Sequence, residues 1–462
     1  MLFKKNYLKN IIFSGFIVFF IMLPLPVVAA NEALLELLKV LRDKGTLSPQ
    51  EYELLVEASK EDNEKIKKSI DEMKAKVKKT KKDSVKITTK GKFKVASQDG
   101  SWEWQPIGRI FWDTVFADRD NSNLEATNSE LRRARLGFQG KIKPLGYKLE
   151  IDFANSGSAT WKDIWLSYNN KNDLGKWFFK IGQHHVPFGH ATISSSKYKP
   201  LMRRPLFGDG PQISRAVGIA YRQDASRWFF HAGAFLPALG TGSDETGEGT
   251  TDRETYAFRI GGQPFFKDKT HLIHSAFSYQ YEQYNGDAFN SIDNSLLSHV
   301  GDGDALVANF GANTDDSNAY DLELISVWGP FHSVFEYVAW DVSDPDGDAD
   351  LSAWAFDVGW FFTGESMKYK AGAFSEIKPK APIGKGGWGA WQIAARFENM
   401  DLTDGNIIGG EADVFTVGLN WYLTSNTRLM ANYGVVLDFD RNGFADDGRE
   451  PSVFQMRAQV YW

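Results

Sequence analysis

Four basic side chains lie close together between positions 197 and 204 of this 462-residue chain. They are Lys197, Lys199, Arg203 and Arg204, and the segment that holds them contains no Asp or Glu. Arginine offers a planar fork of donors that matches the oxygens of phosphate, whereas lysine offers a compact, mobile point charge. Because the segment carries no counter-charge of its own, it is suited to attracting anions.

The surrounding residues predict neither an enzyme nor a metal centre. Ser194–Ser196 lie near His190, but no nucleophile elbow or orienting acid is recognisable, so we predict no catalytic residues. His184 and His185 precede Pro187 without a carboxylate or thiol cluster at ligand spacing. We therefore predict no metal site and no cofactor.

The end of the chain indicates which kind of element positions the basic side chains. From Phe454 to Trp462, apolar and polar residues alternate strictly. A strand with one apolar and one polar face is typical of a transmembrane barrel, whose outside meets lipid and whose inside meets water. The alternation begins at about residue 104, and it predicts sixteen strands that start near residues 107, 130, 147, 160, 177, 215, 228, 254, 271, 319, 331, 352, 389, 414, 428 and 452. The predicted fold is all-β, a 16-stranded antiparallel transmembrane β-barrel with an N-terminal helical and coiled-coil segment.

The connectors between these strands alternate in length, as in bacterial barrels. Short connectors on one side are expected to face the periplasm, and long ones such as 238–252, 286–318 and 438–451 are expected to be extracellular. The stretch 364–387 is long although it falls on the periplasmic side, and the sequence gives no reason for its length. Aromatic residues concentrate at the strand ends, which favours membrane girdles over the buried core of a soluble β-sandwich.

The N-terminal part predicts export and a short helical extension. Residues 1–30 have the positive start, apolar core and small residues before the cleavage point that define a signal peptide. Residues 31–58 predict a helical hairpin, and 59–90 a basic coiled-coil segment and linker before the barrel domain at 91–462. In the coiled-coil segment, apolar residues recur at spacings of four, three and four residues, namely at Ile66, Ile70, Met73 and Val77, which leaves a trimer, a single solvated helix or a flexible linker as alternatives.

Composition narrows the compartment and the partners. The chain has no cysteine, which suits passage through the oxidising periplasm. Its formal net charge is −6, and the signal peptide carries three lysines (Lys4, Lys5, Lys9), so the mature chain is more acidic still. We therefore expect no nucleic-acid partner.

Several motifs carry a family resemblance over residues 100 to 462. They are Glu130–Phe138 (ELRRARLGF), Lys180–Gln183 (KIGQ), Pro187–Gly189 (PFG), Ser194–Lys197 (SSSK) and Asn420–Leu423 (NWYL). Together these segments resemble the phosphate-selective porin O and P family, and the N-terminal helical segment is similar to those ahead of many members. The resemblance implies a 16-stranded, trimeric outer-membrane porin whose loop after the fifth strand folds into the lumen and presents basic side chains to anions.

The resemblance also implies particular site residues. Lys197 matches the family's constriction lysine, and Arg132 and Arg133 match its paired arginines on the second strand. Basic residues near them in sequence or on the inner face complete the predicted anion-binding set: Lys199, Arg203, Arg204, Arg135, Arg215 and Arg259. The family's ladder of arginines is thinned here, since Arg253 and Arg259 are the only basic residues on the eighth strand and its approach, and this weakens a prediction of strict phosphate selectivity.

Three hypotheses for function remain. The leading one is passive diffusion of anions such as phosphate through a trimeric porin in contact with outer-membrane lipid and lipopolysaccharide. The second is a weakly selective general porin, because inward-facing acids could neutralise the bases; the acids predicted to face inward are Asp113, Glu150, Asp152, Asp163, Asp321, Glu323, Asp357 and Glu398. The third is a structural tether or adhesin, in which the barrel anchors a periplasmic N-terminal segment that contacts the cell wall.

Overall fold

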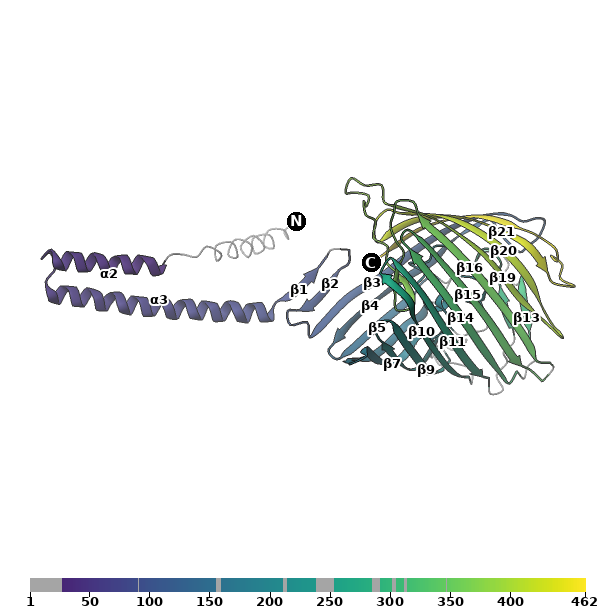
Figure 1. The fold of residues 1–462 in the computed structure, drawn as a ribbon, viewed down its shortest axis with the longest axis horizontal. Coiled ribbons are helices and arrows are strands. Elements are labelled where there is room, and N and C mark those ends of the chain that lie inside the picture. Colours follow the sequence, from purple (N-terminus) through teal and green to yellow (C-terminus); the bar gives the residue numbers. More distant parts are fainter. Residues whose placement is uncertain are drawn as a thin grey trace, which may run out of the picture. The chain divides into compact units, whose positions relative to one another are not determined.

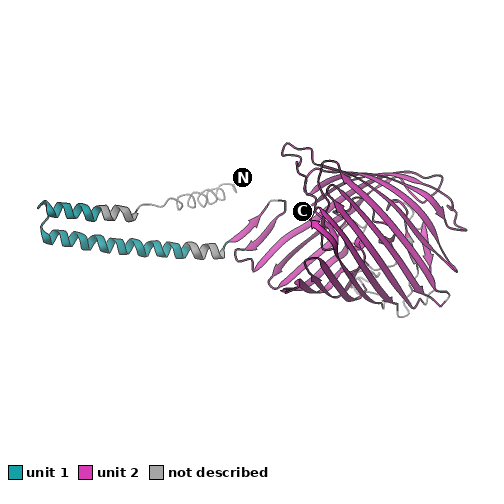
Figure 2. Ribbon diagram, in the orientation of Figure 1, with its two compact units in different colours: residues 1–84 teal, residues 85–462 magenta. Residues whose placement is uncertain are grey.

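The chain divides into two compact units, residues 1–84 and 85–462 (Figure 2). The structure is a computed structural model, and it describes residues 27–89, 91–154, 159–210, 214–237, 253–284, 291–300, 305–310, 314–345 and 347–462. Most of the predicted signal peptide, residues 1–26, and all of the predicted long loop 238–252 lie outside the described residues.

The first unit is a helical hairpin of α2 (Val27–Asp43) and α3 (Pro49–Asp83) (Figure 1). At the start of α3, the side chain of Ser48 accepts from the backbone N–H of Glu51, whose carboxylate accepts from the N–H of Ser48 at 2.9 Å. This capping box satisfies two donors that the first helical turn leaves without partners. The helix then runs without interruption past residue 58, where the hairpin was predicted to end.

Among the described residues, no helix combines the length and the apolar character that would let it cross a bilayer.

The second unit is a closed antiparallel barrel (Figure 1). Within the described residues its sixteen strands are β3 (Trp102–Asp118), β4 (Asn128–Ile142), β5 (Leu145–Asp152), β6 (Thr160–Asn172), β7 (Gly175–His185), β8 (Arg215–Asp224), β9 (Trp228–Leu236), β10 (Glu254–Asp268), β11 (His271–Gln283), β14 (Asp316–Trp328), β15 (Phe331–Ser343), β16 (Ala349–Phe361), β19 (Ala390–Asp404), β20 (Ile407–Tyr422), β21 (Thr427–Asp440) and β22 (Ser452–Tyr461). Each strand pairs with the next along the chain, and β22 pairs with β3 to close the ring. The predicted sixteen-stranded barrel is confirmed.

Short strands add three small hairpins to the barrel. The hairpin of β1 (Val85–Thr88) and β2 (Lys94–Ser97) pairs with the beginning of β3. The other two pairs are β12 (Ser291–Asn294) with β13 (Leu306–Asn309), and β17 (Lys368–Lys370) with β18 (Ala373–Ser375). We call the end of the barrel with the tight connections, such as that between β4 and β5, the turn end, and the opposite end the loop end.

Side chains alternate between the two faces of the barrel wall as the sequence predicted. Outward-facing residues are apolar and exposed, and aromatic pairs lie at the turn end: Trp391 stacks on Trp421 at 4.9 Å between ring centroids, and Tyr168 lies 5.8 Å from Trp177. Such rings, which combine an apolar body with a polar tip, suit the boundary between hydrocarbon and water.

The sequence predicted an inner face that meets water along its whole length. In the structure, part of that face is instead covered by loop residues. At the loop end of β14–β22, inward positions are apolar and buried, and they form a core with residues of in-folded loops. On β15, Val338 and Trp340 have no exposed surface, and they belong to the same core as Leu206 and Leu297. Inward apolar side chains are stable there because loop residues, rather than water, cover them.

The long connector between β16 and β19, residues 362–389, enters the lumen from the turn end. The hydroxyl of Tyr369 lies 2.9 Å from Nδ1 of His274 on β11, and the carbonyl of Gly372 accepts from Arg259 on β10 at 2.8 Å. The carbonyl of Ala371 accepts from Arg222 on β8 at 2.9 Å. Its length, which the sequence left unexplained, follows from the distance it spans inside the barrel.

Candidate functional site: a basic cavity in the barrel lumen

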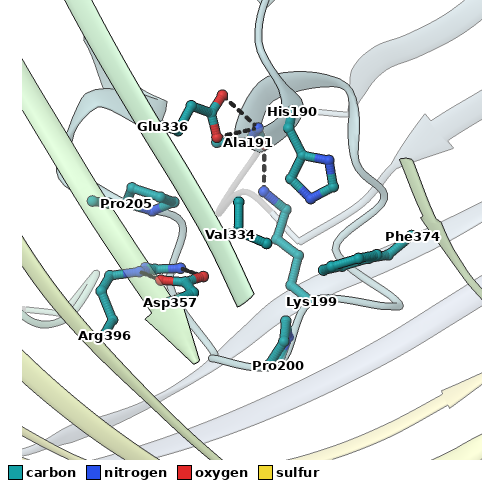
Figure 3. A pocket seen from close by; sticks show the side chains of 11 residues that line it. His190, Ala191, Lys199, Pro200, Pro205, Val334, Glu336, Asp357, Phe374 and Arg396 are labelled. Atoms are coloured by element: carbon teal, nitrogen blue, oxygen red, sulfur yellow. Dashed lines mark hydrogen bonds and ion pairs between the residues drawn. The ribbon is translucent and has the colours of Figure 1, made fainter. Parts of the chain in front are cut away.

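The loop after the fifth strand, residues 186–214, lies inside the barrel. It contains α4 (His190–Ile193) and the short helix η1 (Leu206–Asp209). The backbone N–H of Ala191 donates to both carboxylate oxygens of Glu336 on β15, at 3.0 Å each, and the ammonium of Lys199 donates to the carbonyl of Ala191 (Figure 3). These bonds hold the start of the loop against the wall.

Gly189 permits this close approach. Its φ of 57° is in the left-handed region, and a Cβ at this position would lie 2.8 Å from Oε1 of Glu336 and 3.1 Å from Oδ2 of Asp321. Only glycine adopts that backbone conformation without strain and leaves room for the two carboxylates.

Wall arginines hold the rest of the loop through its carbonyls. Arg428 donates to Lys199 at 2.8 Å, Arg457 to Met202 at 3.0 Å, and Arg396 to Arg203 at 3.3 Å. Two of these arginines also form ion pairs with wall acids. Arg457 pairs with Asp113, and Arg396 pairs with Asp357 (Figure 3). The inward arginines of β19, β21 and β22 therefore fix the loop across the lumen.

Between the loop and the β3–β8 wall lies a cavity of about 390 Å³, which we call the main cavity. A second cavity of about 210 Å³ lies nearer the turn end, and we call it the turn-end cavity. The two share Arg109, Lys148, Lys197 and Tyr198 as lining residues. On the other side, a space of about 20 Å³ shares Arg133, Ser196 and Arg204 with the main cavity. The shared lining residues place these three spaces next to one another along the wall.

The main cavity is strongly positive. Among the described residues that line it, Asp163 is the acid, and eight are bases: Arg109, Arg133, Arg135, Lys148, Lys162, Lys197, Arg204 and Arg215. The excess of bases is what an anion would meet, since the field in a narrow lumen is set by its lining rather than by the net charge of the chain.

Three wall acids pair with part of this positive charge. Glu150 contacts Arg109 at 2.8 Å, and Asp152 contacts Arg135 at 2.7 Å. Asp163 contacts both Arg215 (3.0 Å) and Lys148 (2.5 Å). Within the described part of the chain, Lys162 and Lys197 make no ion pair, so these acids do not balance the bases.

Lys197 lies where the two cavities meet. Its ammonium is 5.3 Å from the ring centroids of both Tyr198 and Tyr461, a cation–π arrangement. Burial, together with the charges of Arg109 and Lys148, lowers the pKa of Lys197 to about 7. Its charge therefore depends on pH near neutrality.

The fold and this lining agree with a comparison of the sequence with known families. The profile of the family described as phosphate-selective porin O and P matches residues 107–462. This chain belongs to that family. It is an outer-membrane porin, and the family resemblance inferred from the motifs is confirmed.

Individual relatives of the porin are distant in sequence. It is 26% identical over 381 residues to an uncharacterized protein of Caulobacter vibrioides. The aligned region covers 78% of the porin and 74% of that protein. Its fold is similar to that of a loop-deletion mutant of OmpT, an outer-membrane protein of Vibrio cholerae, with a TM-score of 0.51, 13% identity, and coverage of 78% of the porin and 100% of that chain. An anion-selective porin from Comamonas acidovorans aligns with a TM-score of 0.46, 14% identity, and the same coverage.

The structure brings most of the predicted site residues of the porin together. Lys197, Arg204, Arg133, Arg135 and Arg215 line the main cavity. A second group lines the small space beside it, towards the loop end, and consists of Arg132 and Lys199.

Two predicted residues lie elsewhere. The guanidinium of Arg203 donates to Asn294 on β12. Arg259 is almost fully buried, and two of its nitrogens donate to Glu323 at 2.6 Å each. Neither residue lines the cavities on the β3–β8 side.

Two β-bulges turn extra basic side chains into the lumen. In the pairing of β3 with β4, Phe111 lies opposite Arg133 and Trp112 opposite Leu131, so Arg132 is an additional residue and lies in the lumen beside Arg133. In the pairing of β5 with β6, a register shift places Lys162 next to Asp163 on the same side. A bulge breaks the alternation of the strand, so strict period-two reasoning could not place Lys162.

Sequence reasoning also left Arg109 and Lys148 out of the predicted anion-binding set. Their inward positions on β3 and β5 follow from the alternation. The alternation does not show how far along the strand, between the turn end and the loop end, a residue lies. That position decides whether an inward residue reaches the narrowest part of the lumen.

One cluster of acids in the porin has the composition of a metal site. Within the described residues, Asp321, Glu323 and Glu336 place carboxylate oxygens within 4.8 Å of one another. Glu323 is engaged by Arg259, and Glu336 by the N–H of Ala191. Glu323 therefore pairs with an arginine of another wall strand, and Glu336 holds the loop against the wall, so two of the three acids already have structural partners.

Proposed function

We propose that this porin is an anion-favouring diffusion channel for phosphate or related oxyanions. The observation that carries the proposal is the lining of the main cavity, where the described residues include eight bases and one acid. An ion that enters a narrow lumen sheds part of its water, and the channel must replace those contacts without holding the ion too tightly. Guanidinium and ammonium groups along a continuous wall provide such contacts for oxyanions.

A reversal-potential measurement tests the proposal. The purified porin is placed in a planar bilayer between two concentrations of potassium chloride. The expected potential has the sign for chloride preference, and added phosphate lowers the chloride current. A potential that favours potassium would rule out the anion channel.

A weakly selective general pore is the second candidate. The observation in its favour is that Glu150, Asp152 and Asp163 pair with wall bases at 2.5 to 3.0 Å. In that case the reversal potential stays near zero and phosphate has no effect on the chloride current.

The orientation and assembly are further parts of the proposal. Short turns of bacterial barrels face the periplasm, and β3 begins at the turn end, so the N-terminal segment is periplasmic and the loop end is extracellular.

Ile66, Ile70 and Met73 are 40%, 41% and 65% exposed on α3, and their spacing suits a coiled coil that joins three copies. Chemical crosslinking in membranes should then give a trimer that weakens when these residues are changed to serine.

A further inference from the structure

The turn-end cavity differs in chemistry from the main cavity. It is lined by Gln105 and Gln139, by the rings of Tyr198 and Tyr461, and by both acids and bases. The two glutamines lie directly opposite each other on β3 and β4. Among the described residues, neither carboxamide makes a hydrogen bond to the protein, so both are available to a solute.

A carboxamide recognises a different group from the one an ammonium recognises. It both donates and accepts hydrogen bonds, as an alcohol does, whereas the oxygens of a phosphate chiefly accept. Glu376, from the connector between β16 and β19, lines the same cavity and adds a further acceptor. This combination suits hydroxyl groups better than bare anions.

Size points in the same direction. The two cavities meet at Arg109, Lys148 and Lys197, and they enclose about 390 and 210 Å³. Inorganic phosphate is comparable with a few water molecules of roughly 30 Å³ each, so it would occupy a small part of this space. A solute with a charged head and a larger neutral body would contact both cavities at once.

We propose that the turn-end cavity binds the hydroxylated body of an organic phosphate ester while Arg109, Lys148 and Lys197 hold its phosphate. The solute class is therefore an ester of phosphate with a polyol, of which a sugar phosphate is the simplest form. This inference rests on the proposed anion channel and adds a determinant for the solute that the basic residues alone do not provide.

The test compares three probes on the purified full-length porin in planar bilayers. Chloride current is measured while inorganic phosphate, glucose 6-phosphate or glucose is added. The sugar phosphate should halve the current at about one tenth of the concentration that inorganic phosphate requires, because it gains hydrogen bonds that bare phosphate lacks. Glucose alone should have little effect. Equal block by the two phosphates would overturn the inference.

A double variant assigns the effect to the glutamines. Gln105→Met with Gln139→Met keeps side-chain length and removes the donors and acceptors. The half-block concentration of glucose 6-phosphate should rise about tenfold, while that of inorganic phosphate changes less than about twofold. A parallel shift for both probes would contradict the assignment.

Two controls separate the possible failures. Gln283→Met, on an exposed residue at the end of β11, should change neither value. Heat-modifiable electrophoretic mobility checks that each variant forms a barrel, and if the double variant does not fold, Gln105→Met alone should give a smaller shift in the same direction. If the unaltered porin shows no chloride preference, the proposed function itself is refuted. If it prefers chloride but glucose 6-phosphate and inorganic phosphate block the current equally, only the organic-ester inference is refuted.

Discussion

The backbone N–H of Ala191 donates to both carboxylate oxygens of Glu336, at 3.0 Å each. This contact joins the first helical turn of the in-folded loop to the opposite wall of the barrel. With the loop held in this way, two of its cations, Lys197 and Arg204, line the main cavity beside the β3–β8 wall.

Replacing Glu336 with alanine should loosen the loop. Removing the acceptor leaves the buried N–H of Ala191 without its partner, which costs about 1–3 kcal/mol, so the loop should leave its position for part of the time. Single-channel recording should show larger and noisier conductance with weaker chloride preference. Glu411→Ala, on the exposed outer face of β20, is the matched control. Identical recordings from both variants would show that this contact does not hold the loop.

Chloride preference should fall as the pH rises through neutrality. The pKa of Lys197 is lowered to about 7 by burial and by the neighbouring charges of Arg109 and Lys148. A lysine is charged below its pKa, so the positive charge is present at about pH 6 and largely lost at about pH 8. Reversal potentials across this range should shift towards zero in the native porin. In Lys197→Arg they should shift much less, because an arginine at this position remains protonated; a flat profile in the native porin would contradict the assignment.

Arg215 and Arg259 should respond differently to the same change. Arg215→Leu removes a cavity charge while Asp163 keeps its contact with Lys148, so chloride preference should fall with little loss of stability. Arg259→Leu leaves Glu323 buried without its arginine, which typically costs about 3–5 kcal/mol. Denaturant unfolding in detergent should detect the second effect, and the channels that do fold should keep the native reversal potential. Equal effects of the two changes on selectivity would contradict the position assigned to Arg259.

The chain contains no cysteine, so single cysteines report which parts of the lumen solutes reach. Ser196→Cys, which lines the main cavity, should react with a negatively charged methanethiosulfonate reagent and then conduct less chloride. Val338→Cys, buried in the apolar core at the loop end of β15, should remain unmodified. Ser196→Cys should react at least about tenfold faster, because the apolar core excludes the reagent from position 338 whereas the positive lining of the main cavity concentrates it. Comparable rates would show that the route does not follow the β3–β8 wall.

Deleting residues 31–84 should leave the conductance of each channel unchanged. The two helices form a compact unit distinct from the barrel, and β1 begins at Val85. Cells that carry the deletion test the tether hypothesis, because a tether would be needed for resistance to detergent and osmotic stress. Altered conductance would show that the helices act on the pore directly.

The sequence by itself determined the barrel. All sixteen predicted strands form, and fourteen begin within three residues of their expected starts, because one face of each strand must meet lipid and the alternation of side chains is fixed by strand geometry. The exceptions are β3 and β20, which begin five and seven residues before their expected starts near 107 and 414. The family motifs likewise located Lys197 and the loop that carries it.

The tertiary structure decided which bases share a cavity. Alternation assigns Arg259 and Arg135 to the same inner face, yet Arg259 is paired with Glu323 behind the loop, whereas Arg135 lines the main cavity. Bulges at Arg132 and Lys162, together with the in-folded connector 362–389, decide which part of the lumen stays open. Strand periodicity records only the face on which a side chain lies. Depth, bulges and loop paths arise from contacts between residues far apart in the chain, and a local pattern does not encode them.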